Sequence, residues 1–237
     1  MAEETVERFH CTMVRWEQVD LWAREVAAKV VAAGARPDVI VGLTRGGWVA
    51  ARLLCDLLGI KELHAVNVDH WGVTATPDGA ATLTHPLTAD VQGKRVLVVD
   101  DLTDTGASLR LAREHVHSLA PARVQTAVLL HITHSILAPD FFSTAIPADQ
   151  WAWFIFPWNV REDLRTLCLK ALNHRAPRST LQVAIALQDQ FTIDVDTELL
   201  AAVLLEGVEA GTIQWKGEGS APSAAADSAE VVGWVRG

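Results

Sequence analysis

The chain has 237 residues and a formal net charge of −9, a length that favours one α/β domain with an appendage over two domains of equal size. Half of its residues are hydrophobic and 21% are charged, a balance that indicates a soluble folded core and excludes a mainly disordered chain. The 20 basic residues form no long Lys/Arg run that could follow a phosphate backbone, so we expect no nucleic-acid partner.

The beginning of the chain alternates between helix and strand patterns. Apolar residues recur at helical spacing over residues 16–33, and Gly34 follows where a helix commonly ends. Residues 39–43, VIVGL, form a continuous apolar run typical of a strand that is buried on both faces of a parallel sheet. A Gly-Gly turn then leads into a second predicted helix over residues 48–59.

The alternation continues through the middle of the chain. We predict strands near residues 64–68 and over residues 95–99, then a helix over residues 109–119 and a strand over residues 124–130. Strands that alternate with helices predict an α/β fold, with a mostly parallel twisted sheet flanked by helices. Ligands of such sheets bind at the carboxyl ends of the strands.

The segment over residues 70–92 is polar and too long for a simple connection in a compact domain. One interpretation is a mobile cover that closes over a binding site. The other is a small β-hairpin. The sequence favours neither over the other.

The character of the sequence changes towards the C-terminus. Residues 161–173 predict a helix, and residues 179–215 predict two helices and a short strand, with Asp196 and Thr197 capping the second helix. From residue 217 the chain is rich in small and polar residues, which predicts a disordered tail. We therefore expect a domain of core plus small hood over residues 1–176, a mainly helical extension over residues 177–216 and a disordered tail over residues 217–237.

The most informative segment is RVLVVDDLTDTGASL, residues 95–109, in which a strand ends in two adjacent carboxylates, Asp100 and Asp101. Backbone N–H groups over residues 105–108, at the positive end of a helix dipole, form a concavity suited to a phosphate. The glycine in this loop allows the anion to approach the backbone closely. Because carboxylates beside such a concavity repel phosphate, they require another partner: sugar hydroxyls, a Mg²⁺ ion or a base to deprotonate.

This segment resembles the signature of type I phosphoribosyltransferases for binding 5-phosphoribosyl-1-pyrophosphate (PRPP), in which apolar residues precede two acids and a D-T-G-x-[ST] loop. The resemblance implies that Asp100 and Asp101 hold the ribose hydroxyls and Mg²⁺, and that residues 105–108 bind the 5′-phosphate. It also implies that Asp104 lies near the imidazole ring of a purine as a candidate general base. An ordinary capped helix after a strand explains one acid and a glycine, but not the full spacing.

The segment Thr44-Arg45-Gly46-Gly47 could, taken alone, be a simple strand-to-helix turn. Beside the first motif, it resembles the pyrophosphate loop of xanthine–guanine and hypoxanthine phosphoribosyltransferases. In that role its backbone donors and Arg45 hold the leaving pyrophosphate, where negative charge grows as the bond to C1 of the ribose breaks. In that family a strained peptide precedes the arginine, which corresponds to the Thr44–Arg45 peptide here.

An aromatic segment, DQWAWFIFPWN, occupies residues 149–159 and contains three tryptophans and two phenylalanines. Packing in the core is one explanation. The segment also resembles purine phosphoribosyltransferases, in which an aromatic residue stacks on the base and neighbouring backbone groups bind its edge. Alignment on the Pro-Trp pair assigns stacking to Trp153, with Phe154 beside it.

The resemblance is strongest to archaeal-type purine phosphoribosyltransferases over residues 9–165, with two departures. Ile132 stands where 6-oxopurine enzymes usually carry a lysine to the base oxygen, and it is flanked by His131, Thr133 and His134. His131 or His134 could substitute for the lysine, although a single histidine is more often structural. Asn159 stands where an acid that helps to hold Mg²⁺ is common. The missing lysine leaves the identity of the base open, because a site without the donor loses discrimination.

The family resemblance implies transfer of a 5-phosphoribosyl group from PRPP to a purine base such as hypoxanthine, guanine or xanthine, with Mg²⁺ as cofactor and pyrophosphate as second product. The alternative is a regulatory protein that senses PRPP or a nucleotide without catalysis. The missing lysine and the additional C-terminal element favour the alternative, and the retained acids argue against it. The candidate PRPP-binding residues are Thr44, Arg45, Gly46, Gly47, Asp100, Asp101, Asp104, Thr105, Gly106, Ala107 and Ser108. Asp104 and Arg45 are the catalytic candidates, Asp100 and Asp101 the metal candidates, and Trp153, Phe154 and Ile132 the base-binding candidates.

Cysteine usage and the N-terminus bear on the compartment. Cys11, Cys55 and Cys168 are widely spaced, so we expect buried free thiols rather than disulfides or a metal cluster. The first ten residues carry acids where a signal peptide needs a basic start, and the chain has no apolar stretch of about 18 residues. We therefore expect a cytoplasmic protein without a membrane partner. Separately, we expect a homo-oligomer, a dimer.

Overall fold

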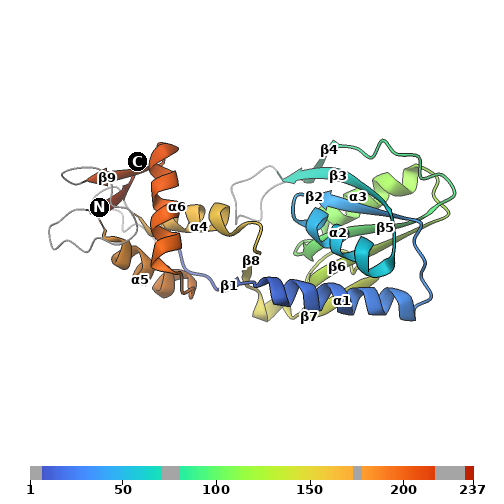
Figure 1. Cartoon of the computed structure of the whole chain (residues 1–237), viewed down its shortest axis with the longest axis horizontal. Coiled ribbons are helices and arrows are strands. Elements are labelled where there is room, and N and C mark those ends of the chain that lie inside the picture. The colour runs from blue at the N-terminus through green and yellow to red at the C-terminus, as the bar shows by residue number, and fades with distance from the viewer. Residues whose placement is uncertain (1–6, 71–80, 173–177, 217–232) are drawn as a thin grey trace. The chain divides into compact units, whose positions relative to one another are not determined.

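The computed structural model describes residues 7–70, 81–172, 178–216 and 233–237. The chain divides into two compact units (Figure 1). The larger unit comprises residues 15–151, and the smaller unit comprises residues 1–14 together with residues 152–237. None of the helices among the described residues is long and apolar enough to cross a membrane.

The larger unit is built on a six-stranded sheet with the order β4-β3-β2-β5-β6-β7. Its strands are β2 (Val39–Thr44), β3 (Glu62–His70), β4 (Ala81–His85), β5 (Arg95–Thr103), β6 (Arg123–Ile132) and β7 (Phe141–Ile146). All neighbours in this sheet are parallel except β4, which pairs antiparallel with β3. The mostly parallel α/β sheet predicted from the sequence is confirmed.

Three helices flank this sheet: α1 (Trp16–Ala32), α2 (Gly46–Leu58) and α3 (Ala107–Ser118) (Figure 1). Val39 and Val41 of β2 share a hydrophobic cluster with Leu109 of α3. Gly42, which points to the other face, lies so close to α2 that an added Cβ would be 2.8 Å from the Cβ of Ala51. Because successive side chains of a strand point to opposite faces, α2 and α3 cover opposite faces of the sheet.

The polar segment over residues 70–92, for which the sequence allows a cover or a β-hairpin, is described only in part. Its residues 81–85 form β4, which pairs with β3 in the antiparallel manner of a hairpin. Residues 71–80 lie outside the described residues, so the interpretation as a cover over the site is not tested. The antiparallel pairing of β4 with β3 agrees with the interpretation of this segment as part of a β-hairpin.

The smaller unit has a largely helical core with two short sheets. Its elements are β1 (Cys11–Met13), β8 (Trp153–Ile155), α4 (Val160–Ala171), α5 (Thr180–Phe191), α6 (Thr197–Glu209), β9 (Ile213–Lys216) and β10 (Gly233–Arg236). Strand β1 pairs parallel with β8, and β9 pairs antiparallel with β10. As predicted, Asp196 caps α6, because its Oδ2 accepts a hydrogen bond of 3.0 Å from the Leu199 amide.

Two boundaries differ from those expected. Strand β8 and helix α4 were assigned to the first domain, but Ile155 and Leu164 pack in one hydrophobic cluster with Leu187 of α5, so they belong to the smaller unit. The expected disordered tail is wrong at its end, because residues 233–236 form β10. Trp234 in that strand is fully buried, and its indole donates to Thr180 Oγ1 at 3.1 Å. Residues 217–232 lie outside the described residues.

The three cysteines are free and buried, as predicted. Burial raises the pKa of the Cys11 and Cys168 thiols to about 12. Thiols with so high a pKa remain protonated at neutral pH and are poor nucleophiles and metal ligands. The cysteines therefore behave as core residues.

Candidate active site

The two glycine-containing loops singled out in the sequence follow neighbouring parallel strands. Strand β2 pairs with β5 as far as Gly42 and Val99, and both chains then continue beyond this pairing. Helix α2 begins at Gly46, and Asp100 follows Val99 directly. The carboxyl ends of these strands therefore place the candidate pyrophosphate loop beside the acidic pair.

Contact between the two segments is so close that no side chain fits between them. A Cβ added to Gly46 would lie 1.8 Å from Oδ2 of Asp101. A Cβ added to Gly47 would lie 2.7 Å from the Cα of Asp100 and 2.7 Å from the carbonyl oxygen of Val99. These distances are shorter than real Cβ contacts. Glycine is required at position 47 for this geometry, because backbone atoms stand in the way, whereas a side chain at position 46 would displace the Asp101 carboxylate.

The peptide bond between Thr44 and Arg45 is cis, a form that is rare when the second residue is not proline. It lies at the peptide where the family resemblance implies an unusual backbone. The Thr44 hydroxyl donates to Oδ1 of Asn67 on β3 at 2.8 Å. A side-chain bond from the neighbouring strand thus holds the start of this loop.

The acidic pair is organised by its own backbone. The Asp101 amide donates to Oδ1 of Asp100 at 3.0 Å, and the Leu102 amide donates to Oδ1 of Asp101 at 2.8 Å. Burial raises the pKa of the Asp100 carboxyl well above its ordinary value, and repulsion from Asp101 raises it further. A cation or hydroxyl donors beside this pair would stabilise its ionised form.

A Mg²⁺ ion fits this pair only together with a substrate. The described residues contain no group of three or more His, Cys, Asp or Glu side chains that could hold a metal by themselves. Mg²⁺ is commonly bound through one or two carboxylates plus substrate phosphates and water, and Asp100 and Asp101 supply that number. Asn159, which replaces the acid expected near the metal, is the N-cap residue of α4 in the smaller unit.

The candidate phosphate loop ends at the N-terminus of α3, which begins at Ala107. Gly106 has φ +80°, and a Cβ there would lie 2.2 Å from Oγ of Ser135. The carbonyl of Thr105 accepts a hydrogen bond of 2.9 Å from the Ile136 amide. The segment after β6 therefore packs against this loop, and the loop presents its backbone at the positive end of a helix.

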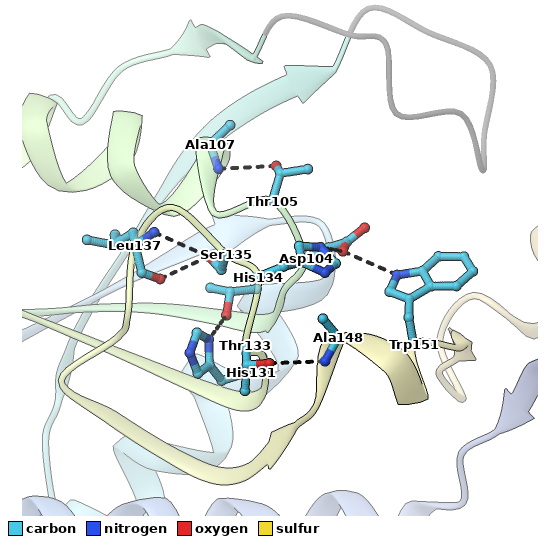
Figure 2. A network of polar contacts seen from close by, with 11 residues as sticks. Asp104, Thr105, Ala107, His131, Thr133, His134, Ser135, Leu137, Ala148 and Trp151 are labelled. Carbon is cyan, nitrogen blue, oxygen red and sulfur yellow. Dashed lines mark hydrogen bonds and ion pairs between the residues drawn. The ribbon is translucent and has the colours of Figure 1, made fainter.

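Asp104 lies between β5 and α3 and is bonded by two side chains from distant parts of the chain (Figure 2). His134 Nε2 is 2.8 Å from Oδ1 of Asp104, and the indole of Trp151 donates to the same oxygen at 3.2 Å. Sequence reasoning missed both bonds. It considered His134 only as a substitute for the missing lysine and Trp151 only as part of the aromatic segment.

A second histidine lies beside this group and is buried. His131 Nδ1 is 2.8 Å from Oγ1 of Thr103, so the ends of β6 and β5 are joined by side chains as well as by backbone pairing (Figure 2). Burial lowers the pKa of His131, and the charge of His134 lowers it further. The neutral imidazole of His131 therefore acts as part of the scaffold.

The burial of Ile132 does not support a contact between its side chain and a base. Its side chain has 0% of its surface exposed, so it presents no surface to a ligand. The next two residues, Thr133 and His134, are exposed instead. Side chains alternate along β6, and burial of the strand end directs the isoleucine into the core.

Trp153 and Phe154 lie on β8 in the smaller unit, and both are partly buried. Trp153 packs against the hydrophobic cluster of that unit, and its amide donates to the carbonyl of His10 at 2.8 Å. This packing agrees with the core explanation for at least part of the aromatic segment. Their role at a base stays a prediction.

Comparisons with known proteins agree with this geometry. The family model described as "Phosphoribosyl transferase domain" matches residues 15–164. The chain is 29% identical to xanthine-guanine phosphoribosyltransferase of Gluconobacter oxydans over 158 residues, covering 67% of this chain and 90% of the relative. It is also 29% identical to the enzyme of the same name from Idiomarina loihiensis over 147 residues, covering 62% and 86%. Among solved structures, a purine phosphoribosyltransferase from Pyrococcus horikoshii is similar with 30% identity and a TM-score of 0.54, covering 62% of this chain and 93% of that one.

Proposed function

The chain belongs to the phosphoribosyltransferase family, and on this premise we propose that it transfers the 5-phosphoribosyl group of PRPP to a purine base and releases pyrophosphate. The names of the relatives support a purine substrate, with xanthine, guanine or hypoxanthine as the first bases to test. The names of these relatives do not favour the alternative, a PRPP or nucleotide sensor without catalysis.

The observation that carries the proposal is the fit between the two glycine-containing loops. Gly46 and Gly47 pack against the carboxylates of Asp101 and Asp100 so closely that no Cβ can stand between them. A turn that only connected β2 to α2 would not need this contact. A site for PRPP does need this contact, because the pyrophosphate is bonded directly to C1 of the ribose. A loop that binds the pyrophosphate must therefore lie beside the acid pair that binds the ribose hydroxyls.

The residues of the larger unit supply the parts of a substitution at C1. Asp100 and Asp101 would accept hydrogen bonds from the ribose hydroxyls, and the backbone over residues 105–108 would bind the 5′-phosphate. As the bond from C1 to the pyrophosphate oxygen breaks, its electron pair leaves with pyrophosphate, where the guanidinium of Arg45 would stabilise the growing charge. The base nitrogen forms the new bond to C1, and Asp104 would accept the proton that the imidazole ring loses.

Mg²⁺ is proposed to be held by Asp100 and Asp101 when PRPP is bound, because the pair carries the one or two carboxylates that such a site requires. The ion would supply charge neutralisation of the phosphate oxygens. Asp100 and Asp101 would orient the ribose through its hydroxyls, and the charge of the ion would offset their repulsion of the phosphate groups.

The base site is proposed from the sequence alone. Trp153 is the candidate for stacking on the purine, and Phe154 is the candidate beside it. Ile132 is the third candidate from the sequence, and its full burial argues against a direct contact with the base. The expected dimer also stays a prediction, which light scattering of the purified chain would test.

Pyrophosphate release tests the proposal. The purified chain is incubated with PRPP and Mg²⁺, with hypoxanthine, guanine, xanthine or adenine added singly, and with no base as the blank. Release that depends on a purine supports the enzyme, whereas PRPP binding without release for any base supports the sensor. Asp101→Asn should lose PRPP affinity in isothermal titration, and the matched control Asp56→Asn, at an exposed position of α2, should keep it.

A further inference from the structure

Asp104 carries two hydrogen bonds on a single carboxylate oxygen. Oδ1 is 2.8 Å from Nε2 of His134 and accepts a hydrogen bond of 3.2 Å from Nε1 of Trp151 (Figure 2). Because an ionised carboxylate only accepts hydrogen bonds, the bond to His134 requires the ring proton on Nε2. Within the described part of the chain, neither donor binds Oδ2. About two fifths of the Asp104 side chain is exposed, so without these bonds the carboxylate would be free to rotate. We call the two bonds to Oδ1 the Asp104 clamp.

The two donors of the clamp are held on one scaffold. The Thr133 amide donates to the carbonyl of Ile146 at 2.9 Å, at the ends of β6 and β7. The Ala148 amide, in the short 3-10 helix η1 (Ala148–Gln150), donates to Oγ1 of Thr133 at 3.0 Å (Figure 2). His134 follows Thr133 and Trp151 follows η1, so these bonds fix both donors relative to each other.

The chemistry of the donors decides which oxygen can take a proton. An indole N–H is a donor only, so Oδ1 of Asp104 must be an acceptor as long as the bond to Trp151 is made. A proton on Oδ1 would weaken the bonds to this oxygen, because the oxygen of a carboxyl O–H group is a poorer acceptor than a carboxylate oxygen. The clamp therefore favours protonation of Oδ2.

We propose that His134 and Trp151 are positioning residues for Asp104, and that the clamp makes Oδ2 the oxygen that accepts the proton of the purine. The inference rests on the proposed function and deepens it. The N–H bond of the imidazole ring breaks, and an O–H bond forms at Oδ2. The nitrogen forms the bond to C1, and the electron pair of the broken C1–O bond leaves with pyrophosphate, so that no further reactant is required.

Kinetics distinguish positioning from a structural role. Trp151→Phe removes the indole N–H but keeps an aromatic ring, and His134→Ala removes the imidazole. We expect each variant to lower kcat roughly tenfold, below the ~100- to 10,000-fold that a general base itself contributes, while KM for PRPP stays within about twofold. His134→Gln, which retains a side-chain N–H donor, should recover part of the loss. The control His117→Ala, at an exposed position of α3, should have the kcat of the wild type.

A double-mutant cycle tests whether both residues act through Asp104. In the Asp104→Asn background, adding His134→Ala or Trp151→Phe should lower kcat no further. The proposal is overturned if either single variant has wild-type kcat, if the glutamine variant is as impaired as the alanine variant, or if the losses multiply fully in the Asp104→Asn background.

The indole N–H resonance of Trp151 reports on the Asp104 clamp, and its measurement does not depend on enzyme activity. It is assigned in a ¹H–¹⁵N spectrum as the signal that Trp151→Phe removes. We expect Asp104→Asn to shift this resonance and the control Asp56→Asn to leave it in place. An unmoved resonance overturns the clamp, even in an active enzyme. A wild-type protein without turnover on any purine overturns the proposed function and the role of Oδ2, whatever the resonance does.

Discussion

Replacing Gly47 with alanine probes the contact between the two loops directly. The added Cβ would lie 2.7 Å from three atoms: the Cα and Oδ1 of Asp100 and the carbonyl oxygen of Val99. Two of these atoms are backbone, so relief requires β5 and the start of α2 to move apart by several tenths of an ångström. Overpacking of this kind costs about 1–3 kcal/mol of folding free energy. It also displaces the Asp100 carboxylate, which we propose to bind the ribose, so we expect at least a tenfold loss of PRPP affinity.

Gly59→Ala is the matched control for this experiment. A Cβ at Gly59 meets nothing within 4 Å, but its φ of +69° makes alanine unfavourable by about 1–2 kcal/mol. The control therefore loses stability without disturbing the site. Urea unfolding measures the free energy of both variants, and isothermal titration measures PRPP affinity with Mg²⁺ present. Wild-type affinity in Gly47→Ala, or an equal loss of affinity in Gly59→Ala, would refute the reasoning.

The remaining predictions concern single residues of the site. Because burial raises the pKa of Asp100, its contribution to stability is present below the ordinary carboxyl pKa and is lost as pH rises through the raised value. Asp100→Asn should therefore be more stable than the wild type at neutral pH while binding PRPP more weakly, and a lower melting temperature would contradict this. Arg45→Ala should lose much of its turnover and bind pyrophosphate less well, by a few kcal/mol, so unchanged pyrophosphate inhibition would remove Arg45 from the site. Trp153→Ala should lose about 1–3 kcal/mol of base binding with PRPP affinity unchanged, as measured by titration, and unchanged base affinity would exclude stacking. Ile132→Lys should lower the melting temperature rather than raise the kcat/KM preference for 6-oxopurines, because it buries an ammonium group; a stable variant with a gained preference would show that the side chain reaches the base.

The elements that the sequence predicted well are those with strong local signals. The continuous apolar run of β2 and the glycines around it predict a buried strand between two helices. Strand β5 was predicted to end at residue 99, but it continues to Thr103, because Leu102 and Thr103 still pair with β6. Acidic residues are uncommon in strands, and the pairing with a neighbouring strand overrides that preference.

The elements that the sequence missed depend on distant partners. Strands β1 and β8 have three residues each and exist because they pair with each other across more than a hundred residues of chain. Strand β10 was taken for part of a tail, although Trp234 is fully buried and pairs with Trp215 of β9. A short apolar stretch after a polar segment gives no local signal of its partner.

In the candidate site, too, features with a local sequence signal could be predicted, and features that depend on distant partners could not. The acids and the phosphate loop are consecutive in the sequence, so their spacing could be interpreted without a structure. The clamp joins Asp104 to His134 and Trp151, which lie 30 and 47 positions further along the chain. No periodicity or motif connects these residues. The burial of Ile132 depends on which face of β6 is covered, which an alignment of the strand alone does not reveal.

The most direct test of the central claim is to identify the product formed from PRPP and a purine. The purified chain is incubated with PRPP, Mg²⁺ and hypoxanthine, guanine or xanthine, and the mixture is separated and analysed by mass spectrometry together with a measurement of pyrophosphate. The proposed function predicts the matching nucleoside 5′-monophosphate and pyrophosphate in equal amounts, and loss of both in Asp104→Asn. Saturable PRPP binding with no nucleotide formed from any purine would contradict it.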